Sequence, residues 1–148
     1  MVEFLLKYHP NVNTSWNGST SLGKACEKGH KEVVEILIQH KSDINIINKN
    51  GSPLLISCKQ NNKDLIKLLL QYNSNVNTTN EAGLTPLNIF IGNGDKDMVE
   101  LLLKHNADVN FSSPNGPTPL IVACEKDQKE LFNILIQQKA NINVKNKH

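Results

Sequence analysis

Hydrophobic positions recur along the chain in four matching clusters. They read VVEILI (33–38), LIKLLL (65–70), MVELLL (98–103) and LFNILI (131–136), and each begins 32 or 33 residues after the one before. Within a cluster the apolar residues fall at helical spacing, as Leu65, Leu68 and Leu69 do. Each cluster therefore predicts an amphipathic helix. The stretch MVEFLL (1–6) matches the same pattern.

A second, shorter helix is predicted before each cluster. The landmarks are STSL (19–22), GSPL (51–54), LTPL (84–87) and PTPL (117–120). A Ser or Thr hydroxyl can accept a free backbone N–H at a helix start, and proline suits the first helical position. This pair occurs at Ser52–Pro53, Thr85–Pro86 and Thr118–Pro119, with Thr20–Ser21 in its place in the first copy. We expect about two helical turns after each pair.

Breaks and reversals divide the chain into helix–turn–helix units. The two helices of a unit are separated at Gly29–His30, Asn61–Asn62, Gly94–Asp95 and Asp127–Gln128. Between units stand the dipeptides Asn17–Gly18, Asn50–Gly51, Ala82–Gly83 and Asn115–Gly116. Such dipeptides supply the positive φ angles of a hairpin-like turn.

An asparagine closes each second helix in the same register. These residues follow Val or Ile and are Asn13, Asn45, Asn77, Asn110 and Asn143. An amide can donate and accept at once where backbone groups are free. We expect each to form a buried bridge between neighbouring loops, a structural rather than a catalytic role.

The unit resembles the ankyrin repeat. The resemblance is clearest in AGLTPLNIFIGNGDKDMVELLLKHNADVN (82–110) and covers nearly the whole chain. It implies an all-α solenoid of stacked helix–turn–helix units joined by β-hairpin-like turns. Another helical-pair solenoid of similar period is the nearest alternative, but it lacks the Asn-Gly turn and the terminal Val-Asn.

The register divides a single ankyrin-repeat domain, 1–148, into one half repeat and four full ones. Residues 1–16 are the C-terminal half of a truncated repeat, and the repeats are 17–49, 50–81, 82–114 and 115–148. Neither end carries the polar outer face of a capping repeat. We therefore expect the chain to be cut from a larger array.

Two departures from the family pattern stand out. The family's His after Thr-Pro-Leu is replaced by Gly23, Leu55, Asn88 and Ile121. The Gly that ends the second helix is replaced by Lys41, Asn73, Asn106 and Lys139. If that position is left-handed, Lys costs about 1 kcal/mol there, whereas Asn tolerates it.

Composition narrows the class of protein. Apolar residues make up 39% and charged residues 20%, as in an ordinary globular chain. A net charge of +2 gives no strong electrostatic case for nucleic acid, and no apolar run is long enough to span a membrane. The N-terminus has no signal-peptide pattern. We expect an intracellular, cytoplasmic chain.

The three cysteines occupy equivalent positions of different units, four residues after a landmark Leu. They are Cys26, Cys58 and Cys124. Packed helices lie about 8–10 Å apart, whereas a disulfide needs Cα atoms within roughly 7 Å. We expect three buried free thiols and a reducing compartment. The stretch GNGDKD (92–97) lacks the alternating ligands of a calcium loop, so we expect no metal there. We also expect no cofactor and no catalytic residue.

The resemblance implies that partners bind a concave side, formed by the turn tips and the first helices. The tip candidates are Trp16, Asn17, Ser19, Lys49, Asn50, Glu81, Leu84, Asn115 and Pro117. The candidates at the first-helix ends are Glu27, Lys28, Lys59, Gln60, Asn93, Glu125 and Lys126. Trp16 is either an interface hot spot or a cover for the flank of the preceding half repeat.

These patterns favour a non-enzymatic scaffold that binds a protein partner. The alternative is a targeting or regulatory segment of a longer enzyme, channel or effector protein. A third hypothesis, a nucleic acid or small ligand in the concave groove, has little support in the mixed charge of the surface. We expect a protein partner, no nucleic acid, no membrane span and a monomer as a fragment.

Overall fold

The computed structural model describes residues 11–48, 50–114 and 116–143. The chain divides into two compact units, Met1–Asn75 and Val76–His148. Each unit holds two helix pairs in its described part. The expected start of the chain inside a second helix (1–6) lies outside the described residues.

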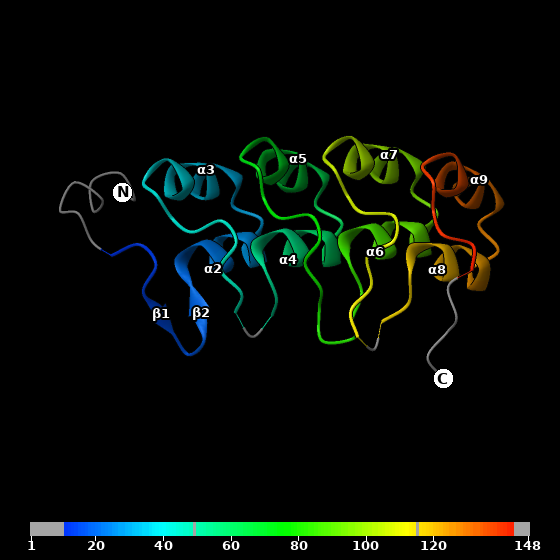
Figure 1. Cartoon of the computed structure of the whole chain (residues 1–148). Helices are drawn as coiled ribbons and strands as arrows, with labels where there is room; N and C mark the ends of the chain where they lie inside the picture. Colours follow the sequence, from blue (N-terminus) through cyan, green and yellow to red (C-terminus); the bar gives the residue numbers. More distant parts are fainter. Residues whose placement is uncertain (1–10, 49, 115, 144–148) are drawn as a thin grey trace. The chain divides into compact units, whose positions relative to one another are not determined.

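The first unit opens with a short hairpin, followed by two helix pairs (Figure 1). Strands β1 (Ser15–Trp16) and β2 (Ser19–Thr20) pair antiparallel, with Trp16 opposite Ser19. The helices are α2 (Ser21–Lys28), α3 (Lys31–Gln39), α4 (Pro53–Lys59) and α5 (Lys63–Gln71). Helix α2 packs against both α3 and α4, and α4 packs against α5. The first helices thus form one row and the second helices another.

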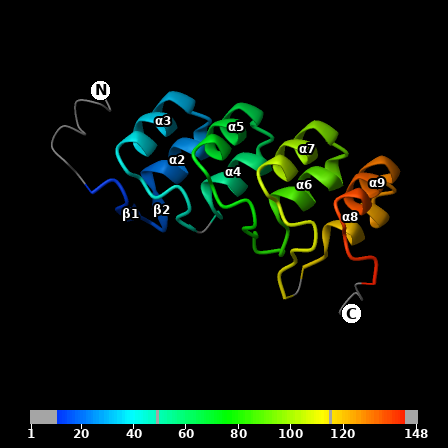
Figure 2. The same cartoon turned by 45° about the horizontal axis from the view of Figure 1, so that its top comes forward.

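The second unit repeats this plan. Its helices are α6 (Pro86–Asn93), α7 (Lys96–Lys104), α8 (Pro119–Glu125) and α9 (Lys129–Gln137). Helix α6 packs against α7 and α8, and α8 packs against α9 (Figure 2). Two pairs of helices stacked in this way confirm the predicted all-α repeat fold within each unit.

Every first helix starts at the hydroxyl residue that the sequence indicated. The N-caps are Thr20, Ser52, Thr85 and Thr118, and each side chain accepts a hydrogen bond from the N–H three residues later. The last three are followed by proline at the first turn. These acceptors satisfy backbone donors that the helix itself leaves unpaired.

The predicted apolar clusters form the interior. Leu65, Leu69, Val99 and Leu135 are completely buried. In α5, Leu65, Leu68 and Leu69 share one side of the helix and are buried, because residues three and four apart lie on the same face. Burying each such side chain contributes about 1.5–3 kcal/mol before the entropy of folding is subtracted.

The second helices end in a left-handed residue at the position where the family has Gly. Lys41, Asn73, Asn106 and Lys139 have φ of 66°, 60°, 65° and 64°. This position is therefore left-handed, and the two lysines carry the backbone strain that was predicted for a left-handed lysine. The turn tip of the first repeat is left-handed as well, at Asn17 (φ 51°) and Gly18 (φ 71°).

The recurring asparagines bridge successive loops, as predicted. Each side-chain Oδ1 accepts a backbone N–H that lies 30 or 31 residues later. The pairs are Asn13 with Asp43, Asn45 with Asn75, Asn77 with Asp108, and Asn110 with Asn141. The expected burial is wrong, however, because Asn13, Asn45, Asn110 and Asn143 are exposed and Asn77 is half-buried. The bridges run along the edge of the loops, where the amides also reach solvent.

The three cysteines are free, but only two of them are buried. Cys26 lies under α4, where Ser57 hydrogen-bonds to its thiol. Burial raises the pKa of Cys26 to about 12 and also raises that of Cys58. Cys124 is exposed, which corrects the prediction of a third buried thiol. Within the described residues no further first helix stacks on α8, whereas α4 stacks on α2, the helix that carries Cys26.

No helix in the described part of the chain is long and apolar enough to cross a membrane.

Candidate partner-binding face

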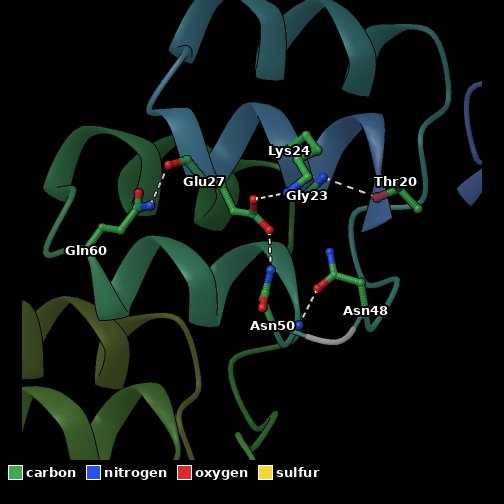
Figure 3. Close-up of polar contacts among 7 residues, drawn as sticks. All are labelled: Thr20, Gly23, Lys24, Glu27, Asn48, Asn50 and Gln60. Carbon is green, nitrogen blue, oxygen red and sulfur yellow. Dashed lines mark hydrogen bonds and ion pairs between the residues drawn. The ribbon is translucent and has the colours of Figure 1, made fainter. Parts of the chain in front are cut away.

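A network around Glu27 joins a first helix, a turn tip and the next first helix of the first unit (Figure 3). Glu27 lies in the last turn of α2, and its side chain is 18% exposed. Its carboxylate accepts hydrogen bonds from Lys24 Nζ at 2.6 Å and from Asn50 Nδ2. Its backbone carbonyl accepts one from Gln60 Nε2 at 2.6 Å. Three elements are thereby fixed relative to one another.

Local sequence explains how these side chains meet. Lys24 and Glu27 are three residues apart on α2, so they lie on the same side of the helix. Asn50 sits in the tight turn closed by the bridge between Asn48 and Gly51. Its backbone N–H donates to Asn48 Oδ1 at 2.8 Å, which orients the tip toward Glu27.

Gly23 makes room for this tip. A Cβ atom at Gly23 would collide with Asn48 Nδ2, so the absence of a side chain lets the tip of the next repeat approach α2. Gly23 stands where the resemblance expected His. Asn48 thus occupies space that a larger residue would fill, and its buried Nδ2 has no hydrogen-bond partner among the described residues.

The second unit joins its tips by a different contact. Asn88, also at the expected His position, donates from Nδ2 to the Pro117 carbonyl at 3.0 Å. The tips themselves touch through Gly83 and Gly116, where a Cβ atom on either residue would meet the backbone of the other. An open hollow of about 470 Å³ lies beside this contact. It is lined by Asn80, Glu81, Ala82, Gly83, Ser113 and Pro114.

A family model described as ankyrin repeats (3 copies) matches residues 1–80 and 54–146. The chain belongs to the ankyrin-repeat family. No curated protein matches it. Ankyrin repeats are generally protein–protein interaction modules and are typically non-catalytic.

Most of the predicted partner-binding residues of this ankyrin-repeat chain lie at the surface. The exposed ones are Asn17, Lys28, Asn50, Lys59, Gln60, Glu81, Asn93, Glu125 and Lys126. Glu27, Leu84 and Pro117 are half-buried. Lys49, Asn115 and the side chain of Trp16 lie outside the described residues, so the two interpretations of Trp16 stay open.

Ser19 departs from the expected position. It lies on β2 and is 5% exposed, and its strand neighbour Thr20 is buried as well, at 3%. The Ser19 side chain is therefore not accessible to a partner.

Two residues of the network did not appear among the sequence candidates. The contact of Lys24 could have been predicted, because Lys24 lies three residues before Glu27 on α2. The role of Asn48 could not have been predicted, because its position depends on the close approach to Gly23 in the preceding repeat.

Within residues 11–48, 50–114 and 116–143, no group of three His, Cys, Asp or Glu could hold a metal ion. In GNGDKD, Asp95 Oδ1 instead accepts the Met98 N–H at 3.2 Å and caps α7. Lys96 pairs with Glu130 at 2.5 Å between α7 and α9, and this hydrogen bond raises the pKa of Lys96.

Proposed function

We propose that this chain is a non-enzymatic scaffold whose inner-helix face binds a protein partner. In each unit we define the inner-helix face as the turn tips together with the first helices, α2 and α4 in the first unit and α6 and α8 in the second. The observation that carries the proposal is the Glu27 network. It holds Asn50 of a tip and Gln60, the C-cap of α4, in fixed positions while both remain exposed. Groups ordered before binding lose less entropy when a partner arrives.

The proposal includes an intracellular, cytoplasmic setting and a monomeric chain. Free cysteines support a reducing compartment. The surface carries both signs of charge, with a formal net charge of +2, which supports a protein partner over nucleic acid.

A second candidate role is a targeting or regulatory segment of a longer enzyme, channel or effector protein. The last helix pair exposes apolar surface that favours a protein neighbour. Ile136 of α9 is 38% exposed, and an open hollow on this helix pair is lined by residues that include Cys124 and Phe132.

The proposal is tested by single alanine substitutions at the tips. The chain is used to capture a partner from its native cell, and the affinity of that partner is then measured for each variant. We choose Trp16, Lys49, Glu81 and Leu84, because truncation in a turn leaves the helical core intact. A hot-spot residue should weaken binding by about 2 kcal/mol or more, which is roughly thirtyfold.

The matched controls are Lys67→Ala and Glu100→Ala. Both residues are exposed on second helices, α5 and α7. Their affinities should match that of the original chain, and every variant should melt normally. If the two control changes abolish capture while all four tip changes are silent, the assignment to the inner-helix face is wrong.

A further inference from the structure

We infer that the inner-helix face of the first unit binds an acidic segment of the partner protein. This inference rests on the proposed function and names the chemistry of the partner at one part of that face. The described residues of the segments that form the face in this unit, 11–30, 44–48 and 50–62, contain three lysines and one acidic residue. Those residues are Lys24, Lys28, Lys59 and Glu27.

The structure brings two of these lysines together at the helix ends. Lys28 is the last residue of α2 and Lys59 the last of α4. The hydrogen bond from Gln60 Nε2 to the Glu27 carbonyl ties the two ends together, and each lysine is the immediate chain neighbour of one bonded residue. Both lysines are exposed, and neither makes an ion pair within the described part of the chain.

The single carboxylate on this face does not cancel their charge. Glu27 is only 18% exposed at its side chain, and its two oxygens are already engaged by Lys24 and Asn50. An approaching partner therefore meets the uncompensated ammonium groups of Lys28 and Lys59 rather than Glu27. Complementary charge of this kind speeds association and selects among partners.

The second unit shows that this charge is local. Its equivalent segments, 76–95 and 110–128, contain one lysine and four acidic residues. These are Lys126, Glu81, Asp95, Glu125 and Asp127. A uniformly basic chain would attract any anion along its whole length, whereas here the positive face is confined to the first unit.

The small net charge favours an acidic protein segment over a nucleic acid or an anionic membrane. The sequence has no arginine, and its 16 lysines against 14 Asp and Glu residues give a net charge of +2, so the chain lacks the broad excess of positive charge that binds a phosphate backbone. Point charges on flexible stems suit carboxylates spread along an extended acidic segment.

The test measures binding of a fluorescent oligoglutamate peptide by anisotropy. The compared chains are the original, the double variant K28Q/K59Q and the matched double variant K31Q/K67Q. The matched variant removes two exposed lysines from the second helices of the same unit, so both variants have the same net charge. Measurements run at low salt and again at about 0.15 M salt, where screening shortens charge interactions to roughly 8 Å.

K28Q/K59Q should weaken oligoglutamate binding by about tenfold, the effect of two exposed ion pairs together. It should also reduce the dependence of affinity on salt, while K31Q/K67Q binds as the original chain does. Thermal melting of both variants checks that they fold. Equal losses in the two variants would overturn the inference, as would tighter binding of single-stranded DNA or phosphatidylserine vesicles than of oligoglutamate.

The captured native partner separates this inference from the proposed function. If the partner is released by the tip variants but binds K28Q/K59Q normally, the face binds protein without an acidic segment, and only the inference fails. If the tip variants retain the partner as well, the proposed function fails with it.

Discussion

The recurring asparagine shows how one side chain can set the spacing of repeats. Its Oδ1 accepts the N–H of the next loop at 2.7–2.9 Å in all four described pairs. Ser or Thr is too short to span from one loop to the next in this way, and a carboxylate would add a charge at every joint. The amide therefore suits a position where loop meets loop at the edge of solvent.

Replacing Asn45 by Ala should destabilise the chain by about 1 kcal/mol. The change removes the acceptor of the Asn75 N–H and leaves that donor to partly exposed surroundings. Urea unfolding followed by circular dichroism measures the free energy of unfolding. Asn45→Asp is the matched control, since it keeps an oxygen acceptor in place and should recover most of the loss. A loss in Asn45→Asp as large as in Asn45→Ala would show that the bridge contributes little.

The sequence predicted the bridging role of these residues but not their exposure. Spacing identifies Asn13, Asn45 and their equivalents as joints, because any repeated contact must recur with the repeat. Burial depends on how far the loops project beyond the helices, and no pattern of residue types records that distance. Ser19 was misplaced for a related reason. Its burial, like that of its strand neighbour Thr20, depends on how the whole hairpin packs, and no pattern of residue types records this.

At the level of elements, the helices were the most predictable part. A hydroxyl followed by proline marks a helix start chemically, and apolar residues at helical spacing mark its buried side. The contacts between tips were not predictable. Gly23 and Asn48, or Gly83 and Gly116, lie more than 20 residues apart, and each pair meets only because the backbones come close.

The contact between the tips of the second unit predicts opposite effects for two glycines. Gly116→Ala should destabilise the chain by about 1–3 kcal/mol, because the new Cβ would collide with the Gly83 carbonyl oxygen and Ser113 Oγ. Gly92→Ala should instead stabilise it by up to about 1 kcal/mol. Gly92 lies within α6, and a Cβ there meets nothing closer than Val122 Cγ1 at 3.9 Å.

Thermal melting of both glycine variants checks this expectation. The two changes add the same methyl group within one unit, so their difference isolates the close approach of the tips. A neutral Gly116→Ala variant would mean that the two tips can separate without cost.

At the scale of the whole molecule, the chain combines two compact units with inner faces of opposite charge balance. The residue list alone made the surface look mixed in charge. In the structure, Lys24 and Asn50 engage the carboxylate of Glu27, and the bond from Gln60 to the Glu27 carbonyl brings Lys28 next to the end of α4. These contacts indicate a positive face in the first unit. The fold class followed from periodicity, whereas the character of the face needed the contacts between repeats.

The rates at which the two buried thiols react should report how the first unit opens. At about pH 8, Cys124 should react at once with a thiol reagent, because it is exposed. Cys26 and Cys58 should react only when the unit opens, since both are buried and burial raises the pKa of each, so almost no thiolate is present in the folded unit. Labelling followed by peptide mass spectrometry gives the rate at each position.

A cavity in the core at α5 should accelerate the reaction of both buried thiols equally. Leu69 of α5 is completely buried, and Leu69→Ala should cost about 2–5 kcal/mol. If α2 to α5 open as one cooperative unit, the open population rises by the same factor at Cys26 and Cys58, about thirtyfold or more. Lys67→Ala, an exposed change on the same helix, should alter neither rate. Acceleration at Cys58 alone would mean that the second helix pair opens without the first, so that the contacts of α2 with α4 do not bind the two pairs into a single cooperative body.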